Sequence, residues 1–309
     1  MLTVIAIGGN ALLQRGQPLE AALLRKNVKV AADSIAPIAK QHSLAIVHGN
    51  GPQVGLLALQ SQAYKKVHTY PLDILDAESQ GMIGYLIQQE LGSRVPNKDI
   101  ITLLTQVVVD EDDPAFLKPT KFIGPIYDEQ QYKNIKTQHD WTFKKDGDAF
   151  RRVVPSPKPK HIYELNGIKK LLRDQSIVIA GGGGGIPCIA SDANSLVGVE
   201  AVIDKDRTAS LLAKQLDAHY FVILTDVDAI YENFGTANAK AIKTISPTNL
   251  RNYNFAAGSM APKVLAACEF VEAQKRPAMI GNLAHLSEIL AGHAGTRIEN
   301  EIATQYYSV

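Results

Sequence analysis

The sequence predicts an α/β protein built on a mainly parallel β-sheet. Short apolar runs rich in β-branched residues alternate along the chain with longer segments of helical spacing. The short runs are almost continuously apolar, which is typical of strands covered on both faces. This alternation favours right-handed crossovers. We therefore expect helices on both sides of the sheet and ligands beyond the carboxyl ends of the strands.

Six of the short runs are predicted as strands and six longer segments as helices. The strands are Thr3–Ile7, Leu44–Val47, Ile100–Val109, Ser176–Ala180, Tyr220–Thr225 and Ala278–Ile280. The helices are Leu19–Gln41, Asp73–Leu91, Glu164–Asp174, Arg207–Leu216, Met260–Gln274 and Leu283–Leu290. In the fifth helix, Val264, Cys268 and Val271 recur at the spacing that forms one apolar stripe.

The composition is that of an ordinary globular protein. Of the 309 residues, 46% are apolar and 20% are charged, which excludes a disordered chain. The length accommodates two domains or one large α/β domain. Thirty-two basic residues nearly balance 31 acidic ones, and the formal charge of +1 argues against a general nucleic-acid-binding protein.

The sequence predicts no membrane segment, secretion signal or protein metal site. No run reaches the roughly 18 consecutive apolar residues of a membrane helix, and the N-terminus lacks the basic start of a signal peptide. We therefore expect a soluble, cytoplasmic protein. The two cysteines, Cys188 and Cys268, lie in apolar stretches and are expected to be buried free thiols.

Residues 110–160 interrupt the strand–helix alternation. This segment is polar and rich in turns, and it contains six of the fifteen prolines. A disordered linker is one interpretation, but aromatic residues are too frequent here for that. We expect an inserted subdomain or lid on the edge of the sheet, within a single domain that spans residues 1–309.

Glycine is concentrated at the ends of three predicted strands. Ten of the 23 glycines lie in three groups: Gly8–Gly9, then Gly49, Gly51 and Gly55, and finally Gly181–Gly185. Any one group is explained by a tight turn that ends a strand. Three groups at the carboxyl edge of one sheet instead indicate backbone amides that approach an anion.

Familiar phosphate-binding motifs are absent from these glycine-rich turns. The sequence contains no G-x-x-x-x-G-K-[ST] loop and no H-R-D or D-F-G kinase motif. The glycines after Ala180 are unbroken and lead to Pro187, unlike a dinucleotide fingerprint. The spacing of these residue types also indicates no Ser/His/Asp catalytic set. His48 follows a predicted strand and could be a ligand or a base, but a structural histidine is the simpler interpretation.

Three lysines are candidates for binding an anion. Lys205 lies between Asp204 and Asp206, which would hold it charged, although the same residues also fit an ordinary helix cap and surface ion pairs. Lys263 lies in the first turn of a helix, where the helix dipole disfavours a cation unless it is solvated or beside an anion. Lys121 belongs to the inserted segment and alone would pass for a surface lysine.

Ten segments resemble those of the carbamate kinases of the amino acid kinase superfamily and occur in the same order. They are distributed over nearly the whole chain. They are Gly8–Ala11, His48–Gly55, Pro71–Asp73, Gln80–Tyr85, Pro119–Lys121, Arg151–Pro157, Gly181–Pro187, Val202–Asp206, Leu224–Asp228 and Gly258–Lys263. The resemblance implies an open αβα sandwich with a mainly parallel sheet of about eight strands, a protruding subdomain and a homodimer.

The resemblance also implies the activity, which is reversible phosphoryl transfer between ATP and carbamate with Mg²⁺ bound to the nucleotide. Family members commonly run it towards ATP in arginine or purine-derived nitrogen catabolism. Carbamate already carries a nucleophilic carboxylate oxygen, so no general base is required. Two alternatives stay open: another small-acid kinase of the same superfamily, and a non-catalytic nucleotide-binding regulator.

Site residues follow from the same resemblance. Lys205, Lys263 and Lys121 correspond to phosphate-contacting lysines, and Asp206 to the aspartate that orients them. The N-terminal part is expected to bind the acceptor and residues from about 200 to 309 the nucleotide. The acceptor and phosphoryl side comprises Gly8, Gly9, Asn10, Gly49, Asn50, Gly51, Gly182 and Gly183. The nucleotide side comprises Thr225, Asp226, Val227, Tyr231 and Met260.

Overall fold

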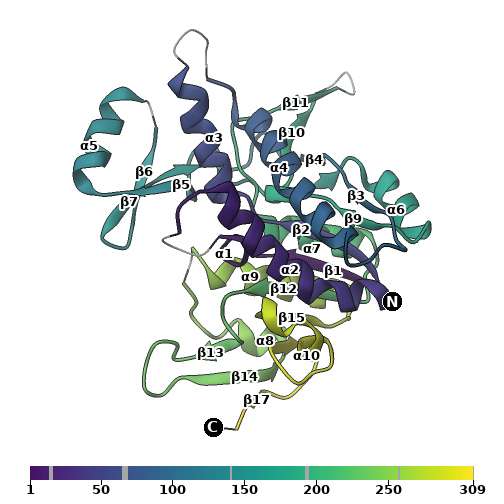
Figure 1. Ribbon diagram of the computed structural model, residues 1–309. Coiled ribbons are helices and arrows are strands. Elements are labelled where there is room, and N and C mark those ends of the chain that lie inside the picture. Colours follow the sequence, from purple (N-terminus) through teal and green to yellow (C-terminus); the bar gives the residue numbers. More distant parts are fainter. Residues whose placement is uncertain (14–16, 65–68, 140, 192–194, 257, 309) are drawn as a thin grey trace.

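The structure is a computed structural model that describes residues 1–309 except 14–16, 65–68, 140, 192–194, 257 and 309 (Figure 1). The strands of its main sheet are β1 Leu2–Ile7, β2 Ser43–His48, β3 Ile100–Thr102, β9 Ile177–Ile179, β12 Tyr220–Thr225, β13 Ile230–Glu232, β14 Lys240–Ile245, β15 Ala278–Asn282, β16 Thr296–Ile298 and β17 Gln305–Tyr306. They are ordered β13-β14-β16-β15-β12-β1-β2-β9-β3, and β17 pairs with β14.

The centre of this sheet is parallel, as predicted. Every neighbouring pair from β15 through β12, β1, β2 and β9 to β3 runs in the same direction. Antiparallel pairs occur only among the described strands of the opposite edge, where β13 and β17 pair with β14 and β16 pairs with β15. These short edge strands raise the total to ten, where about eight were expected.

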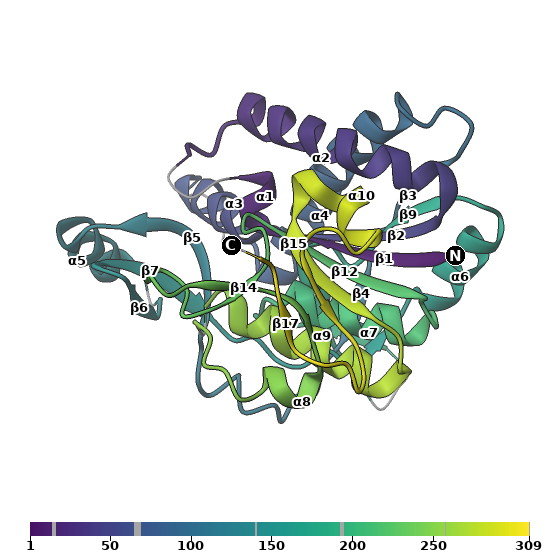
Figure 2. The same ribbon diagram turned by 90° about the horizontal axis from the view of Figure 1, so that it is seen from below.

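Helices cover both faces of the sheet. They are α1 Gly9–Leu12, α2 Ala21–Gln41, α3 Gly51–Ala63, α4 Leu72–Gly92, α5 Glu129–Gln138, α6 Leu165–Arg173, α7 Lys205–Gln215, α8 Pro247–Leu250, α9 Met260–Gln274 and α10 Leu286–Leu290, with 3-10 turns η1 Gly182–Gly184 and η2 Leu283–His285. Seen from below, α2 and α10 lie on one side of the central strands and α7 and α9 on the other (Figure 2). The predicted three-layer α/β class is therefore confirmed.

Alternation along the strands explains the two apolar cores. In β1, Val4 and Ala6 pack with α6, α7 and α9, whereas Ile5 and Ile7 pack with α2, α4 and α10. All four side chains are fully buried. Because successive side chains of a strand point to opposite faces, one apolar strand supplies both cores.

One predicted strand is wrong. Ile100–Val109 is not continuous: after β3, residues 106–108 form β4 (Gln106–Val108) in a second sheet with β8 (His161–Ile162), β10 (Ile186–Ala190) and β11 (Leu196–Gly198). The backbone N–H of Thr105 donates to Gln80 Oε1 at 2.8 Å, and Gln80 Nε2 donates to the Thr105 carbonyl at 3.2 Å. The Thr105 carbonyl also accepts a hydrogen bond from the Ile186 N–H of β10 at 2.8 Å, so the chain turns at Thr105 from the main sheet to the second sheet with its backbone groups satisfied.

Residues 121–154 form a separate three-stranded sheet that projects from the main body (Figure 1). Its strands are β5 Lys121–Tyr127, β6 Phe143–Asp146 and β7 Ala149–Val154, in the order β5-β7-β6. The ring of Tyr132 on α5 stacks on Phe150 with centroids 4.1 Å apart, and Arg152 lies 3.9 Å above the Trp141 ring. We call this segment the protruding subdomain.

The protruding subdomain is anchored through its first and last strands. Ile123 of β5 and Val154 of β7 are buried with Val54 and Ala58 of α3. Gly55 of α3 meets Gly124 so closely that a Cβ at Gly55 would lie 1.9 Å from the Gly124 Cα atom. The backbones of α3 and β5 are therefore in direct contact.

Candidate active site

The first two predicted glycine groups lie side by side at the carboxyl ends of β1 and β2. The Gly8 N–H donates to the Leu224 carbonyl at 2.8 Å, and the Gly49 N–H donates to the Ile7 carbonyl at 3.1 Å. A Cβ at Gly49 would lie 3.0 Å from the Gly9 nitrogen and 3.3 Å from Lys205 Cδ. The two turns and Lys205 therefore share one region at this end of the sheet.

Five charged residues meet beside these turns: Lys121, Asp204, Lys205, Asp206 and Lys263, the lysine–aspartate cluster. Lys205 Nζ lies 2.8 Å from Asp206 Oδ1, and Lys263 Nζ lies 3.2 Å from Asp206 Oδ2. Lys121 Nζ lies 2.5 Å from Asp204 Oδ2. The structure thus brings together three lysines that are up to 142 positions apart in the sequence.

Local sequence explains how α7 contributes to the cluster. Asp204 is the N-cap of α7, and its Oδ1 accepts hydrogen bonds from the backbone N–H groups of Asp206 at 3.0 Å and Arg207 at 3.4 Å. Of the two aspartates that fit a helix cap, Asp204 is the one used, and α7 begins two residues before the predicted Arg207. The cap starts the helix at Lys205, which places Lys205 and Asp206 in its first turn.

Burial and neighbouring charges shift the pKa values of the cluster in opposite directions. Burial lowers the pKa of Lys205, against the raising effect of Asp206. Burial alone would raise the pKa of Asp206, but Lys205 and Lys263 outweigh it and the pKa is lowered. The pKa of Lys263 is raised, because Asp206 and Asp204 outweigh its burial. The carboxylates are therefore held ionised beside their ammonium partners.

The glycines after β9 lie against the N-terminus of α3. Gly182 and Gly183 in η1 are buried. A Cβ at Gly182 would lie 2.4 Å from His48 Nε2, and one at Gly183, where φ is +70°, would lie 2.2 Å from Asn50 Nδ2. Close packing explains why glycine is needed at these two positions.

Asn50 belongs to a buried polar group that sequence reasoning missed. Its Nδ2 donates to Asp76 Oδ1 and to Ser79 Oγ, both at 2.8 Å. Asp76 is fully buried, and burial raises its pKa well above the ordinary value. Asp76, Ser79 and Gln80 follow at i, i+3 and i+4 spacing in α4 and so share one face of the helix with buried apolar residues, and this polar stripe is the signal that would have found them.

His48 is a structural histidine. It is buried, its Nδ1 lies 3.2 Å from the Gly49 carbonyl, and burial lowers its pKa to about 4. The imidazole is therefore neutral near pH 7. It fixes the turn after β2 and is packed against Gly182, as the simpler interpretation of the sequence requires.

The predicted nucleotide-side residues lie at the carboxyl end of β12 and on the elements that follow it. Thr225 ends β12, and its Oγ1 donates to Asp226 Oδ1 at 3.0 Å. Asp226 is exposed and its charge acts on Lys263. Val227 follows, Tyr231 lies in β13, and Met260 is the first residue of α9. Asn10 lies in α1, but its side chain is outside the described part of the structure.

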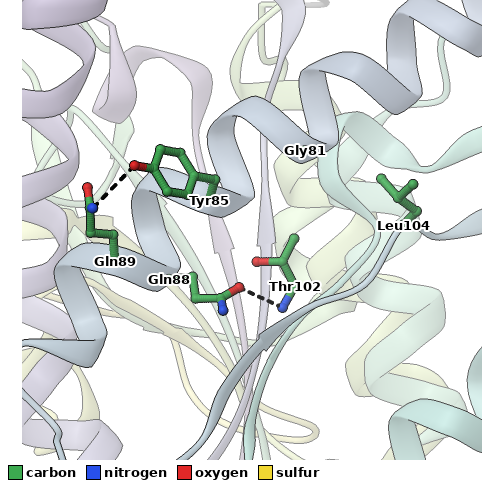
Figure 3. A pocket seen from close by; sticks show the side chains of 6 residues that line it. All are labelled: Gly81, Tyr85, Gln88, Gln89, Thr102 and Leu104. Atoms are coloured by element: carbon green, nitrogen blue, oxygen red, sulfur yellow. Dashed lines mark hydrogen bonds between the residues drawn. The ribbon is translucent and has the colours of Figure 1, made fainter.

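A separate pocket lies between α4 and β3 (Figure 3). It is lined by Gly81, Tyr85, Gln88, Gln89, Thr102 and Leu104, none of which belongs to the lysine–aspartate cluster. Gln88 Oε1 accepts a hydrogen bond from the Thr102 backbone N–H, and Gln89 Nε2 donates to the Tyr85 hydroxyl. Tyr85 and Leu104 are 52% and 54% exposed.

Comparison with known proteins defines the class of this fold and site. Residues 1–282 match the profile of the Amino acid kinase family. The carbamate kinase of Haemophilus influenzae is 51% identical over the whole of both chains, and that of Pyrococcus furiosus is 45% identical over 96% of this chain and 98% of the relative. The chain therefore belongs to the amino acid kinase family.

Within this family, the similar solved structures include the carbamate kinase of Giardia lamblia bound to AMP-PNP. It superposes with a TM-score of 0.87 at 39% identity, covering 97% of this chain and 98% of that chain. The same enzyme bound to citric acid gives a TM-score of 0.91 over the same shares of both chains. Among the residues that the structure describes, no helix is both long and apolar enough to cross a membrane.

Proposed function

We propose that this protein catalyses reversible phosphoryl transfer between ATP and carbamate, which yields ADP and carbamoyl phosphate. The observation that carries the proposal is the meeting of three lysines at the lysine–aspartate cluster, beside the turns that follow β1 and β2. Relatives of 45% to 51% identity over nearly their full length are carbamate kinases, which supports the same acceptor here.

Lys205 and Lys263 neutralise the charge of the phosphoryl group as it moves between donor and acceptor. Asp206 orients both lysines, because each of its carboxylate oxygens receives one ammonium group. Phosphoryl transfer depends mainly on positioning and on electrostatic stabilisation of the transferred group. A charge aimed at such a group typically contributes about 10²–10³ in rate.

Lys121 supplies a third positive charge from the protruding subdomain, which acts as a lid over the phosphoryl group. Backbone amides of Gly9 and Gly51, together with Asn10, contact the carbamate and the transferred phosphoryl group, and Gly8 and Gly49, whose N–H groups bond to the Leu224 and Ile7 carbonyls, hold the two turns in place. Gly182 and Gly183 support this side through Asn50. Thr225, Asp226, Val227, Tyr231 and Met260 contact the nucleotide. Carbamate attacks through its own carboxylate oxygen, so the neutral His48 needs no role as a base.

Mg²⁺ enters this scheme as part of the substrate. In the described ranges, no three His, Cys, Asp or Glu residues are grouped so as to hold a metal ion. Both carboxylates of the lysine–aspartate cluster are paired with lysines. We therefore expect the nucleotide phosphates and water to provide most of the Mg²⁺ ligands, and the ion to neutralise the phosphates.

A coupled assay of ATP formation from ADP, Mg²⁺ and carbamoyl phosphate tests the proposed function. We expect turnover with carbamoyl phosphate and none with acetyl phosphate. Turnover with acetyl phosphate or another acyl phosphate instead would identify a different small-acid kinase. Binding of ADP with no turnover of any acyl phosphate would identify a nucleotide-binding regulator.

We also propose that the chain forms a homodimer. We further propose that it works in the cytoplasm, where ATP and ADP are present. Exposed apolar side chains on α4 and after β3, including Met82, Tyr85 and Leu104, support a protein contact on this face. Light scattering during gel filtration should give twice the 33.5 kDa chain mass. Leu104→Glu should then give the monomer mass. A wild-type monomer would contradict the proposal.

A further inference from the structure

Asp204 uses its two carboxylate oxygens for different partners. Oδ1 accepts hydrogen bonds from the first backbone amides of α7, and Oδ2 pairs with Lys121. The side chain of Asp204 is 12% exposed and that of Lys121 is 29% exposed. One buried carboxylate therefore joins the first turn of α7 to β5, the first strand of the protruding subdomain.

This connection adds an ion pair between parts of the chain that also meet through Val202, which packs with Ile123 and Val154 and donates a backbone hydrogen bond to the Pro155 carbonyl at 3.0 Å. The protruding subdomain is packed through Ile123, Val154 and Gly124 against α3. Lys205 and Asp206 belong to α7, and Lys263 belongs to α9. In the described structure, the ion pairs of Lys121 and of Lys205 involve different aspartates, which are two positions apart.

The charge of Asp204 is maintained by its neighbours. Burial alone would raise the pKa of its carboxyl group, but Lys121 and Lys205 outweigh burial and hold the pKa well below the usual range. Asp204 thus stays ionised throughout the pH range in which kinases are assayed. A permanent negative charge on a rigid helix start is suited to orient a flexible ammonium group from another segment.

We propose that Asp204 is a positioning residue for phosphoryl transfer, which holds the Lys121 ammonium group of the protruding subdomain at the lysine–aspartate cluster. This inference rests on the proposed function, and in particular on a role of Lys121 in turnover. Asp204 acts through Lys121 and through the start of α7, and has no contact with the transferred group of its own. Its negative charge opposes phosphate binding and aids only the placement of Lys121.

The Asp204→Asn variant distinguishes the positioning of Lys121 from the capping of α7. Asparagine is as good an N-cap as aspartate, so the backbone hydrogen bonds of α7 are kept while the charge that holds Lys121 is lost. We expect the kcat for ATP formation to fall about 10-fold to 100-fold, as misplaced groups typically cause. The KM for ADP should stay equal or fall, because a negative charge near the phosphates has been removed.

The decisive measurement is a double-mutant cycle with Lys121→Ala. If Asp204 acts through Lys121, Asp204→Asn should lower kcat strongly in the wild-type background and less than about twofold in the Lys121→Ala background. Equal loss in both backgrounds would overturn the proposal, because the charge of Asp204 would then act independently of Lys121. Asp33→Asn, which removes an exposed ion pair with Arg94, is the matched control and should keep wild-type kcat.

Failure of this inference is distinguishable from failure of the proposed function. One outcome is that the wild-type protein forms ATP from carbamoyl phosphate, and that Lys121→Ala lowers kcat whereas Asp204→Asn does not. In that case only the positioning role of Asp204 is wrong. If Lys121→Ala itself keeps wild-type kcat, both the positioning role and the role of Lys121 are wrong. If the wild-type protein has no turnover, the proposed function fails first. Thermal melting of each variant shows whether it is folded.

Discussion

Three ammonium groups and two carboxylates give the lysine–aspartate cluster a net charge of +1. Charges that are this deeply buried need partners, since desolvation costs several kcal/mol per ion. Asp206 is 2% exposed and has an ammonium group on each oxygen. In the proposed function, this net positive charge suits an incoming phosphoryl group, which carries negative charge.

Replacement of the cluster lysines should lower activity much more than stability. Lys205→Ala and Lys263→Ala should each lower the kcat of the coupled assay about 10²-fold or more, because each removes an aimed positive charge. Lys133→Ala, an exposed lysine on α5, is the control and should keep wild-type kcat. Wild-type kcat from either folded cluster variant would remove that lysine from the mechanism.

Asp76 should make the folded protein less stable as the pH rises. Burial raises the pKa of its carboxyl group well above the ordinary 3.8, so the folded state holds a proton that the unfolded chain releases. Its contribution is fully present below pH 3.8 and is lost as the pH rises through the folded-state pKa. The expected slope is at most about 1.4 kcal/mol per pH unit.

Asp76→Asn isolates this effect, because the amide keeps the acceptor of Asn50 Nδ2 without a titrating group. Denaturant unfolding at several pH values should show the variant gaining free energy of unfolding relative to the wild type as the pH rises. Parallel curves for the two proteins would mean that Asp76 does not bind a proton on folding.

At the scale of elements, the contact between α3 and β5 sets where Lys121 lies. Gly55 and Gly124 allow the two backbones to touch, and Gly124 has a φ of +70°, which favours glycine. Lys121 is the first residue of β5, three positions before this contact. Any side chain between the two backbones therefore moves the strand that carries Lys121.

Gly55→Ala should lower kcat by at least about 10-fold, since its Cβ would displace β5 and a shift of about 1 Å can cost that much or more. The main sheet is untouched, so we expect the variant to remain folded. Gly167→Ala in α6 is the control: a Cβ there meets nothing within 4 Å, and the helix should gain about 0.5–1 kcal/mol. Wild-type kcat from Gly55→Ala would show that β5 is free to adjust.

At the scale of the whole molecule, the two cysteines lie in different parts of the interior: Cys268 of α9 belongs to an apolar core on the main sheet, and Cys188 lies in β10 of the second sheet. Cys188 and Cys268 are buried, and burial raises the pKa of each thiol to about 11. Only the thiolate reacts readily, so both thiols are protected by exclusion of the reagent and by protonation. Cys268 therefore reports on opening of the core under α9, and Cys188 reports on opening of the second sheet.

We expect the native protein at pH 8 to show negligible reaction with a chromogenic disulfide reagent over the time in which free cysteine reacts completely. In denaturant, two thiols per chain should react. Rapid reaction of either thiol in the native protein would mean that the core around it opens without global unfolding.

Sequence patterns determined much of this protein. Continuous apolar runs indicated the parallel central strands, because these strands are buried on both faces. Helical spacing indicated α2, α4 and α9, whereas α3 (Gly51–Ala63) was not predicted. The same local reasoning limited the N-cap to Asp204 or Asp206 and found the glycines at the strand ends. Ile100–Val109 was predicted as one strand, since the break depends on hydrogen bonds from Gln80, which belongs to another element.

Only the tertiary structure decided which of these residues meet. Lys121 pairs with a carboxylate 83 positions away, and Asn50 with one 26 positions away. The short edge strands β13, β16 and β17 also depend on neighbours rather than on their own pattern. The physical reason is that periodicity and capping are properties of adjacent residues, whereas ion pairing and close backbone packing depend on how distant segments are folded together.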